Sequence, residues 1–189
     1  MLIYKYDPEW EIQFGVIKHE LEQLLNGLNI SVQHIGSTSV PGLAAKPIID
    51  IDLIYFDEND FKLIKEMLNT AGYCHVGDQG ISTREVFKRI KSEHVHPVFD
   101  NIRHHLYVCN VHSEELKRHL IFRYHLRNNN ASMVAYQELK QKIAEQANND
   151  RKIYAKLKET LAKSFIESKL DEYIDNNLTI EKLIHEESQ

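Results

Sequence analysis

Two aspartates lie two residues apart in a segment that is typical of a β-strand. Asp50 and Asp52 alternate with Ile49, Ile51 and Leu53, and β-branched residues favour an extended backbone. In such a strand both carboxylates point to one face, with their Cα atoms about 6.6 Å apart, which is two strand rises. The pair predicts a shared divalent metal ion, Mg²⁺ or Mn²⁺, with Asp50 and Asp52 as catalytic metal ligands. Because the carboxylates repel each other without that ion, we expect that neutralising either one leaves the fold intact.

A Gly-Ser pair stands upstream of this strand. Gly36 and Ser37 follow the alternating segment 30–35 and precede a short predicted helix that begins near Thr38. The free backbone N–H groups at a helix N-terminus, together with the helix dipole, favour an anion. We therefore expect Gly36 and Ser37 to contact a phosphate group, and a helix-capping role for Ser37 is compatible with that contact. His34 is a candidate either to orient this turn or to be a structural histidine.

Three cationic side chains are candidates for further contacts with phosphate oxygens. Lys46 precedes the aspartate strand, and Arg84 and Arg103 precede two later predicted strands. Arginine suits bidentate contact with phosphate, whereas lysine acts as a point charge. The alternative for each is a solvated charge or an ion pair with Asp50 or Asp78. The prediction is that at least one of the three contacts phosphate.

The segment 34–52 resembles the signature of the GrpB family, also called UPF0157, a branch of the nucleotidyltransferase superfamily. The segments 77–89, 103–108 and 118–123 fall in the family's order, and the resemblance covers about residues 5–170. It implies transfer of a nucleotidyl group from a nucleoside triphosphate, with Mg²⁺ or Mn²⁺, to an unidentified small or protein acceptor. The alternative is a weakly active or inactive nucleotide- or metabolite-binding module of the same fold.

The superfamily usually supplies a third carboxylate from a neighbouring strand, and the sequence contains no clear candidate. The predicted strand 106–111 and the residue before it offer His105 and Tyr107 on one face. Histidine binds Mg²⁺ poorly but suits manganese or zinc. The metal preference of the site is therefore open, and Glu85 or Asp100 remains an alternative third ligand from another strand or a loop. We also expect His105 to contact the substrate.

Histidines are concentrated in one part of the chain, which raises the alternative of a transition-metal site. They are His94, His96, His104, His105 and His112. Two histidines at positions i and i+2 share a strand face, but no cysteine or third ligand at a zinc spacing accompanies them. The zinc site is therefore the less favoured interpretation.

The hydrophobic pattern predicts an α+β fold with helices and a small mixed sheet, and the resemblance implies that this sheet is of the nucleotidyltransferase type and is backed by the helices. We expect strands at 30–35, 48–56, 86–90, 95–99 and 106–111. We expect helices at 8–27, 57–69, 113–127, 130–147 and 150–170. After residue 171 the alternatives are frayed ends and a last helix carrying Ile174, Leu178, Ile180 and Leu183. Residues 1–112 would form the α/β core, and residues 113–189 a helical segment packed on it as part of a single structural unit.

The composition narrows the class of protein. With 189 residues, 42% of them hydrophobic, the chain can bury a sizeable core. A formal charge of -5 disfavours nonspecific nucleic-acid binding, which needs a basic surface. Cys74 and Cys109 have no paired spacing, and no apolar run approaches the roughly 20 residues of a membrane helix. These features predict a cytoplasmic protein without a membrane partner, and they leave its oligomeric state open.

Overall fold

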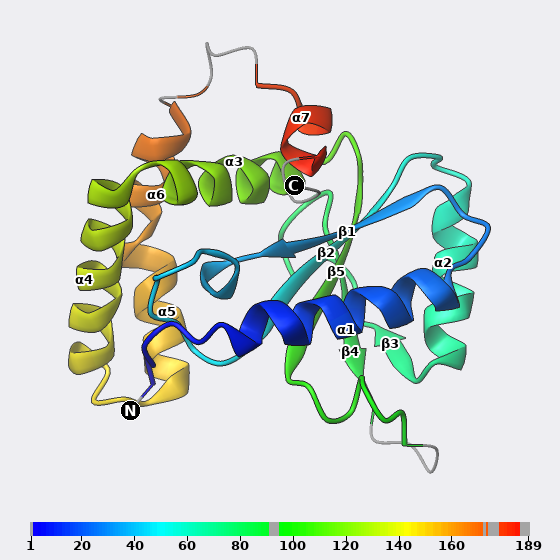
Figure 1. Ribbon diagram of the computed structural model, residues 1–189, viewed down its shortest axis with the longest axis horizontal. Helices are drawn as coiled ribbons and strands as arrows, with labels where there is room; N and C mark the ends of the chain where they lie inside the picture. Colours follow the sequence, from blue (N-terminus) through cyan, green and yellow to red (C-terminus); the bar gives the residue numbers. More distant parts are fainter. Residues whose placement is uncertain (1, 91–94, 172, 174–177, 186–189) are drawn as a thin grey trace.

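The computed structural model describes residues 2–90, 95–171, 173 and 178–185. Its centre is a five-stranded sheet in the order β1-β2-β5-β4-β3 (Figure 1). The strands are β1 (Ile30–Ile35), β2 (Ile49–Tyr55), β3 (Tyr73–His75), β4 (Glu85–Arg89) and β5 (His104–Asn110). The pair β2 and β5 is parallel and the other three pairs are antiparallel. The sheet is therefore mixed, as predicted.

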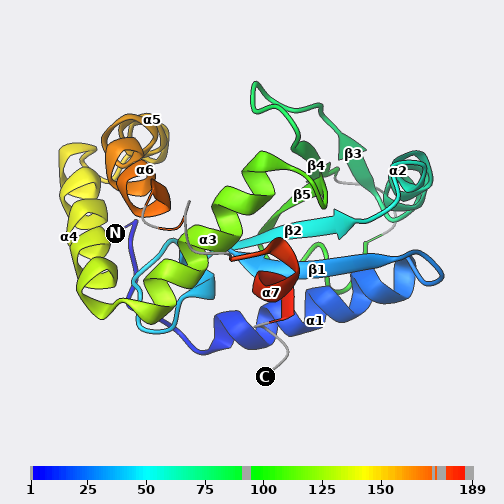
Figure 2. The same ribbon diagram turned by 90° about the horizontal axis from the view of Figure 1, so that it is seen from above.

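Helices cover both faces of this sheet and extend beyond one end of it. They are α1 (Glu9–Leu24), α2 (Asp60–Thr70), α3 (Glu114–Asn128), α4 (Asn130–Gln146), α5 (Arg151–Leu161), α6 (Lys163–Asp171) and α7 (Ile180–His185). In Figure 1, α1 and α3 lie on opposite sides of the sheet, and Figure 2 shows α4, α5 and α6 gathered at the end far from α2. The α+β architecture with a helical C-terminal segment is confirmed.

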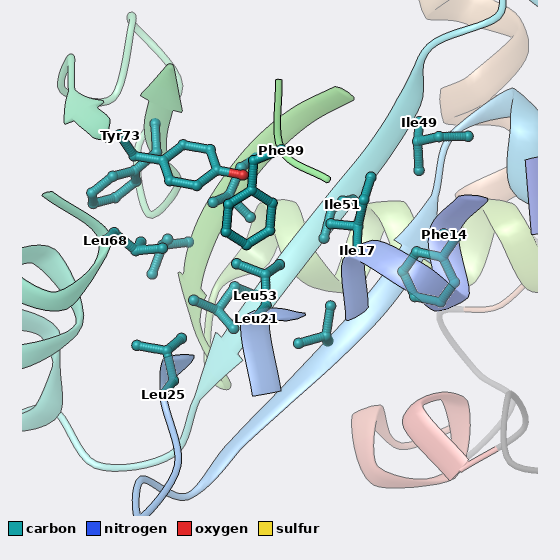
Figure 3. Packing of buried hydrophobic residues seen from close by; sticks show 14 of the residues in the cluster. Phe14, Ile17, Leu21, Leu25, Ile49, Ile51, Leu53, Leu68, Tyr73 and Phe99 are labelled. Atoms are coloured by element: carbon teal, nitrogen blue, oxygen red, sulfur yellow. The ribbon is translucent and has the colours of Figure 1, made fainter. Parts of the chain in front are cut away.

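The side chains of β2 divide between the two faces, as the strand period requires. Ile51 and Leu53 are fully buried and pack against Ile17 and Leu21 of α1 in the larger core (Figure 3). The alternate positions point to the face that α3 covers, where Ile54 joins a second apolar cluster. Asp50 and Asp52 belong to this second set, so both carboxylates lie on the α3 side of the sheet.

The predicted strand at 95–99 is wrong. Pro97 has no backbone N–H to donate to a neighbouring strand. The ring of His96 accepts hydrogen bonds from the backbone N–H groups of Val98 and Phe99, which holds the chain in a turn. The edge partner of β4 is instead β3, a strand that the sequence analysis did not predict.

Two predicted helices also differ from the structure. The single helix expected at 150–170 is divided into α5 and α6 at Ala162. The last helix is confirmed for Ile180–His185, whereas residue 174 lies outside the described residues.

Across the described ranges, no helix is both long and apolar enough to cross a membrane.

A buried arginine joins three elements on the α3 face. Arg123 of α3 donates hydrogen bonds to the carbonyl of His34 in β1 (2.7 Å) and to that of Leu183 in α7 (3.0 Å). It also donates to the side-chain oxygen of Gln33 (3.0 Å). Arg123 and Gln33 are both almost fully buried. These hydrogen bonds fasten the last helix to the sheet edge.

We predict that Arg123→Met lowers the free energy of unfolding by about 2–4 kcal/mol, because buried acceptors lose their donor. Urea denaturation measures this change, and hydrogen exchange in residues 180–185 should become faster. Arg151→Met, at an exposed position of α5, is the matched control. Equal stability of the two variants would show that Arg123 does not hold α7 in place.

Candidate functional site

A cavity of about 1020 Å³ lies on the α3 side of the sheet. Its walls come from the Gly-Ser turn, from β2 and β5, and from α3, α4, α5 and α6. Residues before and after position 112 therefore contribute to the same cavity. The C-terminal helices are part of the site as well as part of the fold.

The structure brings together most of the predicted site residues. Those that line the cavity are Gly36, Ser37, Lys46, Asp50, Arg84 and His105. Asp52 is fully buried and has no exposed surface. Arg103 is exposed and lies outside the cavity lining, and its backbone carbonyl accepts a hydrogen bond from Ile49. The structure thus separates Arg103 from the other predicted cations.

Asp50 is held by its neighbours on two adjacent strands. Its Oδ1 accepts a hydrogen bond from Nδ1 of His105 (2.8 Å), its register partner on β5. Burial alone would raise the pKa of Asp50, but the hydrogen bond and charge of His105 hold the pKa below its ordinary value. Asp50 is therefore a carboxylate at neutral pH, and it faces the cavity.

Asp52 is paired with a histidine of α3 that the sequence analysis did not select. Nδ1 of His119 donates to Oδ2 of Asp52 (2.8 Å), and Nε2 of His119 lies 3.2 Å from Oε1 of Glu115. Burial would lower the pKa of His119, but the two carboxylates raise it to about 10. The side chain is therefore an imidazolium between Asp52 and Glu115. The four-residue spacing of Glu115 and His119 places both side chains on one helix face. This spacing is the feature of the sequence that could have identified the pair.

The two aspartates fit a metal ion only together with further ligands. Within the ranges that the structure describes, no group of three His, Cys, Asp or Glu side chains could hold a metal ion. Oδ1 of Asp52 is nevertheless a buried acceptor without a hydrogen-bond partner among the described residues. One or two carboxylates completed by substrate phosphates are a common ligand set for Mg²⁺. Asp50 lines the cavity and Asp52 lies outside its lining, so a metal ion held by both would need further ligands from a bound phosphate.

The two alternative third carboxylates lie elsewhere. Oε2 of Glu85 is 2.5 Å from Nε2 of His75. Its register partner Val108 belongs to the core on the opposite face of the sheet from Asp50. The carboxylate of Asp100 accepts hydrogen bonds from the guanidinium of Arg89. Neither residue supplies the missing ligand.

The clustered histidines have separate partners. Nε2 of His104 lies 2.6 Å from the hydroxyl of Tyr73, and the ring of His96 stacks on Phe99. His112 is exposed, and His94 lies outside the described residues. The described histidines therefore do not converge on one metal ion, and the structure does not support the zinc interpretation.

His34 is a structural histidine. Its ring stacks on Phe14 with centroids 4.6 Å apart, and its Nε2 lies 3.0 Å from the hydroxyl of Thr38. Burial lowers the pKa of His34 to about 3, so the ring is neutral. It helps to fix the turn that follows β1.

Two of the predicted cations lie over aromatic rings in the cavity. The guanidinium of Arg84 is 4.4 Å from the ring centroid of Tyr107, and its Nε is buried without a partner among the described residues. Nζ of Lys46 is 3.9 Å from the ring centroid of Tyr154. Burial, the larger cause, and the charges of Lys158 and Arg151, the smaller causes, lower the pKa of Lys46 to about 8. Both side chains keep donors that could serve an anion.

The C-terminal helices add cations that the sequence analysis did not predict. Lys140 of α4 is fully buried and donates to Oγ of Ser37 (3.0 Å) and to the carbonyl of Ala44 (2.5 Å). Lys158 of α5 and Arg118 of α3 also line the cavity. The short helix after Gly36 is a 3₁₀ turn, Ser37–Ser39, and no side chain caps it. The Ser37 hydroxyl contacts Lys140 at the cavity wall instead of capping this turn.

Glycine is required at position 36, and we predict that Gly36→Ala destabilises the protein by about 1–3 kcal/mol. Its φ is +71°, and a Cβ there would collide with Oδ2 of Asp50. Gly15→Ala is the control, because a Cβ at this helical position meets no atom within 4 Å and should stabilise α1 by up to about 1 kcal/mol. Urea denaturation compares the two. A Gly36→Ala variant as stable as the wild type would show that this close approach is unimportant.

The imidazolium of His119 predicts a pH-dependent contribution to stability. Because its pKa in the folded protein is raised above the unfolded value, this contribution is complete below about pH 6.5 and is lost as the pH rises through about 10. The difference in unfolding free energy between the wild type and His119→Gln should shrink over that range in urea denaturation. His112→Gln, at an exposed position, should show no such trend. A difference that stays constant would contradict a protonated His119.

Each carboxylate of β2 has an imidazole partner, so the expectation that either can be neutralised without cost has to be revised. We expect Asp52→Asn to destabilise the protein, because a buried cation loses its counter-charge.

Comparisons with known proteins agree with the resemblance seen in the sequence. A family model described as GrpB protein matches residues 1–176. Glutamate-rich protein GrpB of Alkalihalophilus pseudofirmus is 29% identical over 175 residues, which cover 91% of this chain and 95% of that protein. A UPF0157 protein of Halalkalibacterium halodurans is 30% identical over 165 residues, or 87% of this chain and 80% of that protein. The crystal structure of conserved protein GrpB from Enterococcus faecalis has a TM-score of 0.73 and 32% identity, covering 90% of this chain and 98% of that one. The chain therefore belongs to the GrpB family.

Proposed function

We propose that the cavity binds a nucleoside triphosphate and that the protein transfers a nucleotidyl group from it to a small or protein acceptor. The observation that supports this most is the meeting of the Gly36–Ser37 turn, the carboxylate of Asp50 and several cations in one cavity. Its volume of about 1020 Å³ is at the upper end of ordinary ligand pockets and is sufficient for a nucleotide.

The charges of the cavity favour a phosphate-bearing ligand. Arg84 directly precedes β4, Arg118 belongs to α3 and Lys158 to α5, and all three line the same cavity. Arginine can contact phosphate oxygens in pairs, and lysine adds a point charge. Lys46 has a pKa of about 8, and an anion beside it would raise this pKa and favour the charged ammonium.

Asp50 and Asp52 would hold the Mg²⁺ or Mn²⁺ ion that accompanies the phosphates. When bound, such an ion stabilises the negative charge that develops on the departing pyrophosphate. His105 fixes one oxygen of Asp50, and His119 fixes one oxygen of Asp52. The histidines would orient the carboxylates toward the ligand, as second-layer partners of metal sites do.

A nucleotide-binding module without turnover is the second candidate. The observation that favours it is the imidazolium of His119, which lies between Asp52 and Glu115 and offsets one of their two negative charges. Such a site would attract an anion but would hold a metal ion less tightly than one with three free carboxylates. The resemblance of segment 34–52 to nucleotidyltransferases supports the enzyme instead, and product analysis separates the two.

Titration calorimetry with ATP, GTP, CTP and UTP, each with Mg²⁺ or Mn²⁺, tests this proposal. We expect one or more nucleotides to bind with a metal ion and, once an acceptor hydroxyl or phosphate is supplied, mass spectrometry to detect the nucleotidylated acceptor and released pyrophosphate. Arg84→Met and Lys158→Met should each weaken binding about tenfold or more, which corresponds to about 1.4 kcal/mol. Arg103→Met should have little effect, because this side chain lies outside the cavity lining.

The results separate the candidates. Binding without products would favour the binding module. If no nucleotide binds with either metal ion, or if Arg103→Met weakens binding more than Arg84→Met does, the assignment of this cavity is wrong.

A further inference from the structure

Lys140 is a buried lysine with an unusual set of neighbours. Only 1% of its surface is exposed, and its Nζ contacts Oγ of Ser37 and the carbonyl of Ala44. No carboxylate lies within ion-pair distance of Nζ among the residues that the structure describes. Its nearest ring is Tyr136, whose centroid is 4.9 Å away. The lysine therefore has hydrogen-bond partners but no counter-charge.

This environment favours the neutral amine. A buried ammonium group without a paired anion is costly. Burial is the main cause that lowers the pKa of Lys140 well below its usual range, and the positive charge of Lys158 is the smaller one. In the neutral form, one N–H can donate to the carbonyl of Ala44, and the nitrogen lone pair is then free to accept the Ser37 hydroxyl proton. The charged lysine donates to Oγ of Ser37 across this 3.0 Å contact, whereas with the neutral amine the serine hydroxyl would be the donor.

Ser37 lies where its hydroxyl could react with a ligand in the cavity. Ser37 is half-buried and lines the cavity beside Asp50 and Gly36. The neighbouring Ser39 differs, because its hydroxyl donates to the carbonyl of Gly36 (2.7 Å) and its side chain is buried. A serine within hydrogen-bond reach of a neutral base, at the wall of a ligand cavity, is the arrangement of an activated nucleophile.

We propose that Ser37 is a nucleophile with Lys140 as its general base, and that it is the first acceptor of the nucleotidyl group. This inference rests on the proposed function, because it requires a nucleoside triphosphate in the cavity. Oγ of Ser37 forms a bond to the α-phosphorus while the bond from that phosphorus to the bridging oxygen breaks. Pyrophosphate leaves with the bonding electrons, and the serine proton passes to Nζ of Lys140. The product is a nucleotidyl ester of Ser37, ready for transfer.

Radiolabelled ATP tests the covalent step. The full-length protein is incubated with Mn²⁺ and ATP labelled at either the α- or the γ-phosphorus, denatured, and analysed for retained label and modified peptide. We expect α-label on Ser37 and none from the γ-position. Ser37→Ala should abolish labelling, and Lys140→Met should slow it about 100-fold or more, the usual contribution of a general base. Lys142→Met, at an exposed position of the same helix, should label at the wild-type rate.

A second probe tests the nucleophile without a nucleotide. A fluorophosphonate should form a bond from its phosphorus to Oγ of Ser37, release fluoride and leave the proton on Lys140. Its rate should rise with pH in the wild type, and this rise should be lost in Lys140→Met. If Lys140 only supports the turn, Lys140→Arg should restore reactivity, because arginine keeps the donors but cannot act as a base.

The outcomes distinguish this inference from the proposed function. ATP binding without α-label, together with no phosphonate adduct on Ser37, would overturn the inference and leave nucleotide binding intact. Retained γ-label would also overturn it, because the serine would then accept a phosphoryl group. Failure of ATP to bind, with a phosphonate adduct still formed on Ser37, would overturn the proposed function and the nucleotidyl step. Urea denaturation of each variant checks that lost labelling does not reflect unfolding.

Discussion

The pairing of each β2 carboxylate with an imidazole is the interaction on which the site depends. Asp50 accepts from His105 on the adjacent strand, and Asp52 accepts from His119 on α3. The strand period directs both carboxylates to the face that α3 covers, where an unpaired buried charge would be strongly unfavourable. The histidines make that burial possible. They also leave Asp50 ionised and facing the cavity.

This pairing also connects the sheet to the C-terminal helices. His119 ties α3 to β2, and Arg123, one turn later, ties the same helix to β1 and α7. With α3 fixed in this way, α4 can bring Lys140 to the Gly-Ser turn, and α5 places Lys158 in the lining of the same cavity. The cavity therefore depends on helix packing as much as on the strand that carries the aspartates.

The features that could be predicted from the sequence are those with a local pattern. The alternation around Asp50 and Asp52 predicted β2 and the face of its carboxylates, and the helical periodicity predicted α1 to α4 with small errors at their ends. The turn at 97–101 was missed because its cause, a histidine ring accepting two backbone N–H groups, has no periodic signal. The short strand β3 has only three residues and gave too little pattern.

The candidate site was predictable only where its residues are close in sequence. Gly36, Ser37 and Asp50 belong to one segment, whereas the partners of Ser37 and Asp52 are 103 and 67 residues away. Such contacts arise from tertiary packing, which no local spacing encodes. Arg84 and Arg103 looked equivalent in the sequence. Only the packing of the elements shows that Arg84 enters the cavity and Arg103 does not.

The cavity that we propose for the triphosphate lies between the Gly-Ser turn and the cations of the C-terminal helices. A crystal structure with Mn²⁺ and a non-hydrolysable ATP analogue would test this proposal most directly. We expect phosphate density in contact with Ser37, Arg84 and Lys158, and an anomalous manganese signal at Asp50 and Asp52. An analogue bound outside this cavity, or a manganese signal away from both aspartates, would contradict it.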